Sequence, residues 1–76
     1  MIERPEAIER IITTANELQQ TGQTSASTGE RIAAAFVMHR MDWLPPGYDP
    51  QEAWDRLGSW QRFVVMIWDN WMDEFG

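Results

Sequence analysis

The chain has 76 residues, no cysteine, and twelve acidic residues against six basic ones, which gives a net charge of −6. A chain of this length forms one domain, residues 1–76, and the lack of cysteine excludes a disulfide framework and a thiolate metal site. The acidic balance argues against direct nucleic-acid binding, because phosphate contacts need a positive protein surface.

The first predicted element is a helix from Pro5 to about Gln20. A proline suits a first helical position, where its missing N–H costs nothing. Apolar residues recur at helical spacing and form a stripe wide enough for one neighbouring helix: Ile8, Ile11, Ile12, Ala15 and Leu18. The polar segment 20–26 follows as a short linker, and Gly22 can end the helix in a left-handed cap.

The second predicted helix runs from Ser27 to about Arg40. Ser27 and Glu30 have the spacing of a capping box, in which each side chain accepts a hydrogen bond from the other residue's backbone N–H. The segment Met41–Asp49 follows as an irregular loop, because its two prolines and its glycine do not continue a helix. Its aromatic residues leave two interpretations open, a lid that packs over the core or a rigid recognition loop.

The third predicted helix, Pro50–Leu57, is short and begins with an aspartate cap followed by proline. Gly58 interrupts it, and Ser59 is the expected cap of a long last helix that reaches Phe75. This last helix holds three of the five tryptophans and would be about 25 Å long. Its inward side is apolar at spacings of three and four: Trp60, Phe63, Val64, Ile67, Trp71 and Phe75.

Together these elements predict an all-α fold, a small four-helix bundle with three long helices and one short one. The tryptophan-rich C-terminal helix is expected at its centre. The N-terminal residues lack the apolar run of a signal peptide, and the longest apolar run, Ile32–Met38, is too short to cross a bilayer. A cytoplasmic location without a membrane partner is therefore expected.

No catalytic constellation is found in the sequence. His39 is the only histidine, and its place near the end of a predicted helix favours a solvated or helix-capping role. Neither a metal-binding motif nor a phosphate-binding glycine loop is present, so we expect no enzyme activity, no metal and no cofactor. A helix-turn-helix is possible for residues 50–75 by length, but the carboxylates late in the last helix would face phosphate.

The carboxylates at the C-terminus stand out. Asp69, Asp73 and Glu74 fall in the last turns of the predicted helix, where the helix dipole disfavours negative charge. Either an arginine such as Arg31 or Arg40 neutralises them, or they form a docking surface for a basic partner. The residues predicted to bind a partner combine this acidic end with the adjacent apolar flank: Val65, Trp68, Asp69, Met72, Asp73 and Glu74.

The segment 27–61 carries a capped alanine-rich helix, the turn DWLP, and the helix AWDRL before a Trp-Gln pair. In these features it resembles a stretch of small accessory proteins encoded by phages and prophages of Gram-negative bacteria. The resemblance implies a phage origin, and many small acidic phage proteins inhibit host or rival-phage machinery, anti-CRISPR proteins among them.

The expected function is therefore that of a small acidic protein-binding module, a phage-derived inhibitor or modulator of a protein with a basic surface, acting in the host cytoplasm. The nucleic-acid-mimicking form of this hypothesis has the carboxylates occupy a site that normally holds nucleic acid. Two alternatives stay open. One is a homo-oligomeric accessory protein of a phage assembly, for instance a homodimer through the last helix. The other is a small helix-turn-helix regulator that binds DNA.

Overall fold

The computed structural model describes residues 4–75 and is all-helical, with no strand among these residues. The α-helices are α1 (Glu6–Thr21), α2 (Thr28–Val37), α3 (Pro50–Leu57) and α4 (Gln61–Asn70). Three short 3-10 helices, η1 (Met41–Trp43), η2 (Gly58–Trp60) and η3 (Met72–Glu74), lie between and after them. The predicted all-α class is confirmed. Over the described range, no helix combines the length and the apolar character that crossing a bilayer requires.

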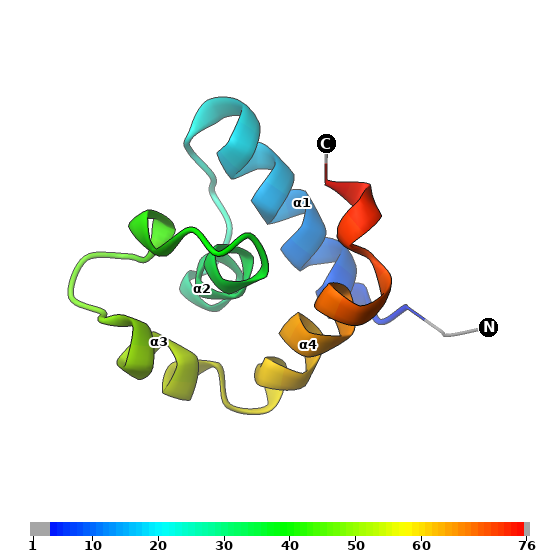
Figure 1. The fold of residues 1–76 in the computed structure, drawn as a ribbon. Helices are drawn as coiled ribbons and strands as arrows, with labels where there is room; N and C mark the ends of the chain where they lie inside the picture. The colour runs from blue at the N-terminus through cyan, green and yellow to red at the C-terminus, as the bar shows by residue number, and fades with distance from the viewer. Residues whose placement is uncertain (1–3, 76) are drawn as a thin grey trace.

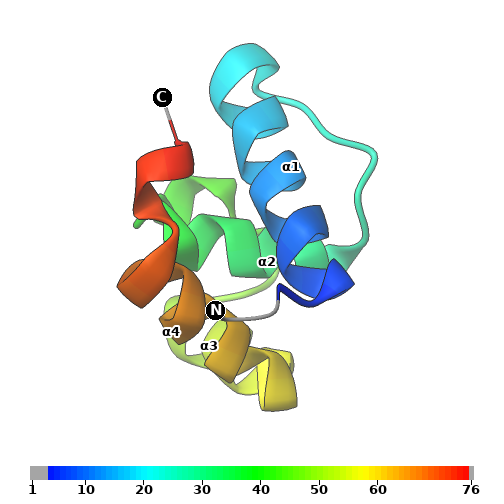
Figure 2. The ribbon, with the colours of Figure 1, turned by 90° about the vertical axis from the view of Figure 1, so that its right-hand side faces the viewer.

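The centre of the fold is α2, which corrects the prediction of a central C-terminal helix. Figure 1 looks along α2, with α1, α3 and α4 arranged around it. α2 packs against each of these three helices and against η1. The view turned by 90° shows α2 behind α1, with the C-terminal segment beside α1 and with α3 and α4 below (Figure 2). The reason lies in composition, because α2 carries three consecutive alanines that are fully buried and let neighbouring helices approach closely.

The core consists of two groups of buried side chains. The larger group joins α1, α2, α3 and α4: Ile8, Ile11, Ile12, Ile32, Ala33, Val37, Ala53, Leu57, Val64 and Ile67. The smaller group joins α1, α2 and η1, and its largest member is Trp43, which is only 6% exposed. Trp43 also receives a hydrogen bond of 2.8 Å on its carbonyl oxygen from Arg31 Nε. The first part of the segment Met41–Asp49 is therefore a lid over the core, whereas Pro46 and Gly47 are exposed.

Local signals set the end of α1 and the starts of α2 and α3. Gly22 has the expected left-handed conformation (φ 76°) after α1, and Asp49 caps α3 through the backbone N–H of Glu52 at 2.8 Å. The capping box is present at α2, where Ser27 Oγ accepts from Glu30 N–H and the Glu30 carboxylate accepts from Ser27 N–H. The Ser27 hydroxyl also donates to Glu30 Oε1 at 2.7 Å. This bond first, and then the bond from Ser27 N–H, lower the pKa of Glu30 below its ordinary value.

We expect Ser27→Ala to lower the free energy of unfolding by about 1 kcal/mol, because α2 loses the side-chain acceptor for its first turn. Urea unfolding followed by tryptophan fluorescence measures this change. Ser25→Ala is the matched control, since Ser25 is an exposed serine of the preceding linker, and its effect should stay within about 0.5 kcal/mol. Equal effects of the two variants would contradict a capping role for Ser27.

α2 ends earlier than predicted, at Val37 instead of about Arg40. The N–H of Arg40 donates to Ala35 O at 2.8 Å and the N–H of His39 donates to Phe36 O at 3.2 Å. These two bonds form a Schellman motif, which needs a left-handed residue after the helix. His39 takes that conformation, with φ 54°. The prediction of a longer helix was wrong because no glycine marks the stop in the sequence.

α4 is also shorter than predicted, with ten residues instead of a helix from Ser59 to Phe75. Ser59 does not cap it, because residues 58–60 form η2, and the α4 residue Gln61 instead donates to Trp54 O at 2.8 Å. At its other end the backbone leaves the helix at Trp71 (φ −131°, ψ 19°), and the Asn70 side chain donates to Met66 O at 2.9 Å. A continued helix would have brought all the late carboxylates to its negative end, which is unfavourable.

Candidate protein-binding surface

The predicted binding residues divide between two elements. Val65, Trp68 and Asp69 lie on one face of α4 by their helical spacing, while Met72, Asp73 and Glu74 belong to η3. Val65 is 42% exposed and Met72 is 36% exposed, the two large hydrophobic side chains most open to solvent in the described structure. Asp69 and Asp73 are exposed, and neither forms an ion pair with any residue from 4 to 75.

Glu74 behaves differently from the other two carboxylates. It pairs with Arg4, whose second guanidinium nitrogen donates to Glu74 Oε1 at 2.7 Å. Arg4 also lies 2.6 Å from Glu9 through Nε, without the alignment of a hydrogen bond, and its guanidinium stands 5.4 Å from the Trp71 ring centre. Glu74 is therefore held within the chain, and we remove it from the candidate surface.

The arginines considered in the sequence do not neutralise this end of the molecule. Arg31 donates to Trp43 O, and Arg40 binds both carboxylate oxygens of Asp42 at 2.9 and 2.8 Å. Arg4 takes this role instead, although it is 70 positions from Glu74 in the sequence. Spacing along a helix carries no signal for a contact of this kind.

The Arg4–Glu74 pair predicts a pH-dependent stability. The hydrogen bond from Arg4 lowers the pKa of Glu74 below its ordinary value. The pair therefore contributes fully above the ordinary pKa of a glutamate, and its contribution is lost as the pH falls through the lowered value. We expect Arg4→Gln to lower the melting temperature at pH 7 and this difference to shrink in acid. Arg62→Gln is the control, because it removes a guanidinium that lies over the Phe63 ring but no ion pair. Its difference in melting temperature from wild type should not follow the titration of a carboxylate.

Trp68 is the structural centre of the candidate surface. Its indole N–H donates to Val37 O at 3.1 Å, at the end of α2. The indole is nearly parallel to the His39 ring, at 5.3 Å between centres and 7°, and to the Trp54 ring, at 6.3 Å and 5°. Phe36 meets Trp54 edge to face at 5.0 Å. We call these four residues, Phe36, His39, Trp54 and Trp68, the aromatic face.

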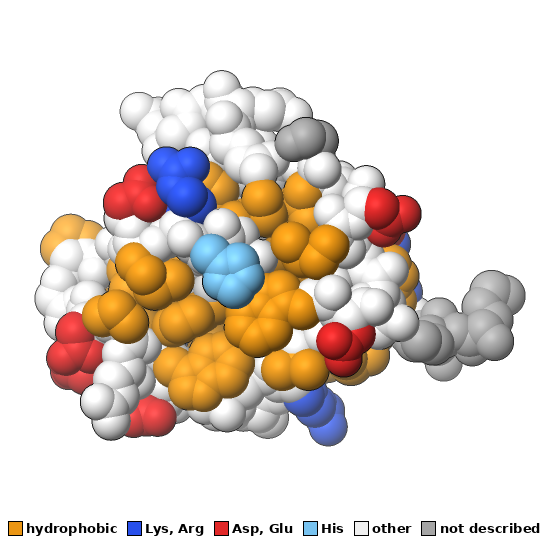
Figure 3. Space-filling view, viewed as in Figure 1, with side chains coloured by type: hydrophobic (Ala, Val, Ile, Leu, Met, Phe, Trp, Pro, Cys, Tyr) orange, Lys and Arg blue, Asp and Glu red, His pale blue; other side chains and the backbone are white. Residues whose placement is uncertain are grey.

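The sequence did not assign His39 or Trp54 to this surface. His39 is exposed, in agreement with the expected solvated histidine, and Trp54 is half-buried. Figure 3 shows the histidine near the middle of a broad hydrophobic area, with acidic side chains around its edge. The sequence carries no local pattern for the aromatic face, because this face forms only when α2, α3 and α4 pack together.

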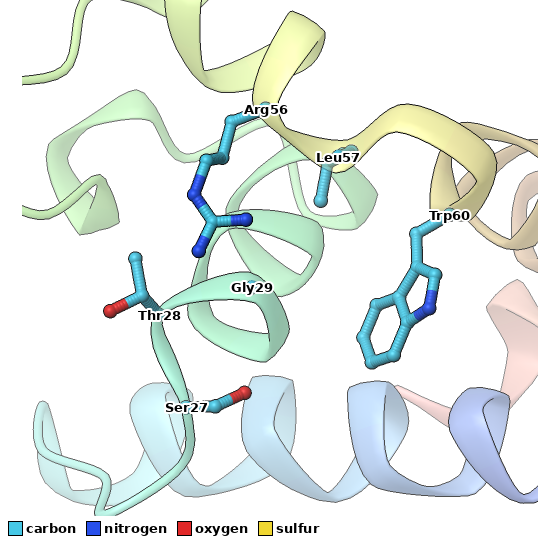
Figure 4. Close-up of a pocket in the computed structure, with 6 residues that line it drawn as sticks. All are labelled: Ser27, Thr28, Gly29, Arg56, Leu57 and Trp60. Carbon is cyan, nitrogen blue, oxygen red and sulfur yellow. The ribbon is translucent and has the colours of Figure 1, made fainter.

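A hollow of about 360 Å³ lies at the start of α2. It is lined by Ser27, Thr28, Gly29, Arg56, Leu57 and Trp60. Figure 4 shows Arg56 extending toward the first turn of α2, with Trp60 on the other side of the opening. The capping box already supplies acceptors for backbone N–H groups at the start of α2, and one of these acceptors is the Glu30 carboxylate. The hollow is therefore not built to select an anion.

A second, open groove of about 330 Å³ runs between α1 and the linker that precedes α2. Four glutamates and one arginine are among the residues that line it: Glu6, Glu9, Glu17, Glu30 and Arg10. Arg10 pairs with Glu6 at 3.0 Å, and Arg4 with Glu9. The groove offers no exposed large apolar side chain, which distinguishes it from the surface at the end of α4.

Within residues 4–75, no group of three or more histidine, aspartate or glutamate side chains is placed to hold a metal ion. Comparison of the chain with protein families, with curated proteins and with solved structures gave no match.

Proposed function

We propose that this chain is a protein-binding module and that the end of α4 contacts a partner with a basic surface. One observation carries the proposal: Asp69 and Asp73 are exposed without an ion-pair partner in the described structure, and Val65 and Met72 lie open in the same segment. Unpaired carboxylates beside exposed apolar side chains are typical of an interface with an apolar centre and a charged rim.

Electrostatics supports a protein partner over nucleic acid. The chain has a net charge of −6, which opposes the approach of a phosphate backbone. In the helix-turn-helix alternative, α4 would present polar side chains to a groove. Gln61 at the start of α4 instead donates to Trp54 O, which leaves Arg62 as the exposed cation of the first turn. One arginine does not supply the phosphate contacts that DNA binding needs.

In its narrower form, the proposal is that the module inhibits or modulates a host or rival-phage protein in the cytoplasm. The resemblance of residues 27–61 to phage-encoded proteins supports this form. A partner that normally binds nucleic acid would offer the basic surface, and Asp69 and Asp73 would occupy part of it.

A homodimer through α4 is the second candidate, because Val65 and Met72 are apolar and exposed. A two-fold interface would bring Asp69 and Asp73 of both copies together, and like charges at a shared interface oppose association. Sedimentation over a range of concentrations tests this directly. We expect a monomer, and a dimer that is lost in Val65→Ser would favour the alternative.

The proposal is tested by capture from a lysate of the producing host, followed by mass spectrometry and reconstitution with the purified candidate. The purified partner should have a basic surface, and its complex should weaken as salt rises, because exposed charges are screened. A complex that is insensitive to salt, or a partner without a basic patch, would count against the proposal.

A further inference from the structure

His39 adopts a conformation that an L-amino acid rarely takes. It is the only non-glycine residue with positive φ among residues 4–75, and it sits at the Schellman position where glycine is common. Glycine would fill this position without the steric penalty that a Cβ atom brings. A strained residue of this kind at an exposed position points to a role for the side chain.

The imidazole of His39 extends the aromatic face into solvent. It covers one side of the Trp68 system, and the parallel rings of His39, Trp68 and Trp54 form a continuous surface. The bond from Trp68 to Val37 O and the edge contact of Phe36 with Trp54 hold that surface in place. A rigid aromatic surface of this kind loses little conformational freedom when a ligand settles on it.

Two unpaired carboxylates adjoin the tryptophans of the aromatic face in sequence. Each of its tryptophans is followed in the chain by an exposed aspartate, Asp55 after Trp54 and Asp69 after Trp68. Neither aspartate forms an ion pair with a described residue. Arg40, next to His39 in sequence, is directed elsewhere, because Asp42 binds it and it lies 5.0 Å from the Trp43 ring centre.

The chain itself places arginine over aromatic rings at three other positions. Arg4 lies over Trp71, Arg40 over Trp43 and Arg62 over Phe63, at 5.4, 5.0 and 5.2 Å. No arginine of residues 4–75 lies over Trp54 or Trp68 in this way. The aromatic face thus has ring surface with no arginine of the described chain over its tryptophans, and the net charge of −6 favours a cation from a partner.

We propose that the aromatic face receives an arginine side chain of the basic partner, an inference that rests on the proposed function. The guanidinium lies flat on the Trp54–Trp68 surface beside the His39 ring, and Asp55 or Asp69 accepts its N–H groups. Arginine fits better than lysine, because its planar, weakly hydrated group stacks on aromatic rings and donates two parallel hydrogen bonds to a carboxylate.

The test uses the full chain labelled with ¹⁵N and three blocked pentapeptides of the pattern Gly-X-Gly-X-Gly, in which X is arginine, lysine or citrulline. Citrulline keeps the planar shape of arginine and removes its charge. The indole N–H signals of Trp54 and Trp68, assigned with Trp→Phe variants, report binding. We expect the arginine peptide to shift both signals, with affinity about tenfold above the citrulline peptide and a few-fold above the lysine peptide.

Two variants locate the site. Asp55→Asn combined with Asp69→Asn should weaken the arginine peptide by about tenfold, and His39→Gly should weaken it several-fold while the melting temperature is kept or raised. Glu17→Gln is the matched control, because Glu17 is an exposed carboxylate of the groove beside α1, and it should leave binding unchanged.

Three outcomes overturn the inference: no shift with about 10 mM arginine peptide, equal binding of the citrulline peptide, or shifts that follow dilution of the protein alone and so indicate self-association.

Failure of the arginine site is distinguishable from failure of the proposed function. If the arginine and citrulline peptides bind alike while the partner complex stays salt-sensitive and survives His39→Gly, the arginine site is wrong and the proposed function stands. If the arginine peptide binds selectively but no basic partner exists, the proposed function is wrong.

Discussion

Replacing Trp68 with alanine is expected to lower the free energy of unfolding by about 3 kcal/mol, the low end of the range for an aromatic side chain that is packed in a protein. Trp68 joins three helices at once, through its hydrogen bond to Val37 O and its contacts with His39 and Trp54. For a domain of this size the loss corresponds to a fall in melting temperature of about 12–24 °C. Urea unfolding and thermal denaturation followed by circular dichroism measure both quantities.

Two variants separate the contributions to this effect. Trp68→Phe keeps an aromatic ring but removes the indole N–H, and it should cost about 1 kcal/mol because Val37 O loses its donor. Val65→Ala, on the same helix face, should stay within about 0.5 kcal/mol because that side chain is 42% exposed. A Trp68→Ala protein as stable as Val65→Ala would show that the aromatic face does not hold the fold together. Since Trp68 supports the fold, its removal is not a clean test of binding.

Reversing the charge of Asp69 and Asp73 together is expected to weaken the partner complex by at least about 100-fold. Each arginine would meet the basic surface of the partner with like charge, which costs several kcal/mol in a close interface. The fold should survive, because both side chains are exposed and lack ion-pair partners in the described structure. An arginine at position 69, in the last turn of α4, should even gain a few tenths of a kcal/mol from the helix dipole.

The matched control for this experiment changes net charge equally at another surface. Glu17→Arg, Gln20→Arg and Gln23→Arg together give the same change in net charge on α1 and the linker after it. Binding measured by calorimetry should change little in this control. If the control weakens the complex as much as the reversal at Asp69 and Asp73, then either the groove beside α1 binds the partner or the attraction depends on overall charge alone.

The elements that the sequence predicted well are those that depend on neighbouring residues. Ser27 with Glu30, Asp49 with the following proline, and Gly22 satisfy helix ends within a few positions, so their signals are readable in the chain. The helix Pro50–Leu57 was predicted with the bounds that the structure has.

The elements that the sequence missed depend on distant contacts or on strain. α2 ends at Val37, before the left-handed His39, without a glycine. The segment that follows α4 is bound through Glu74 by Arg4, from the other end of the chain. The position of α2 at the centre follows from how closely its alanines pack, which periodicity does not reveal.

The candidate surface was predicted in part. The sequence assigned Val65 and Met72 to an apolar flank beside the acidic end with Asp69 and Asp73, and all four residues are exposed. Glu74 pairs with Arg4, which the sequence did not indicate as its partner, and Trp68 is half-buried between α2 and α3. Exposure along one helix is thus readable from sequence, whereas the partner of each charge requires the tertiary structure.

Hydrogen exchange of the backbone amides, measured with and without the purified partner, tests the central claim most directly. If the end of α4 is the contact, amides of residues 65–73 should exchange more slowly in the complex, because an interface excludes water and suppresses local opening. Amides of α1 and of the linker 22–27 should exchange as they do in the free protein. Protection confined to α1 and that linker, with residues 65–73 unchanged, would contradict the proposed surface.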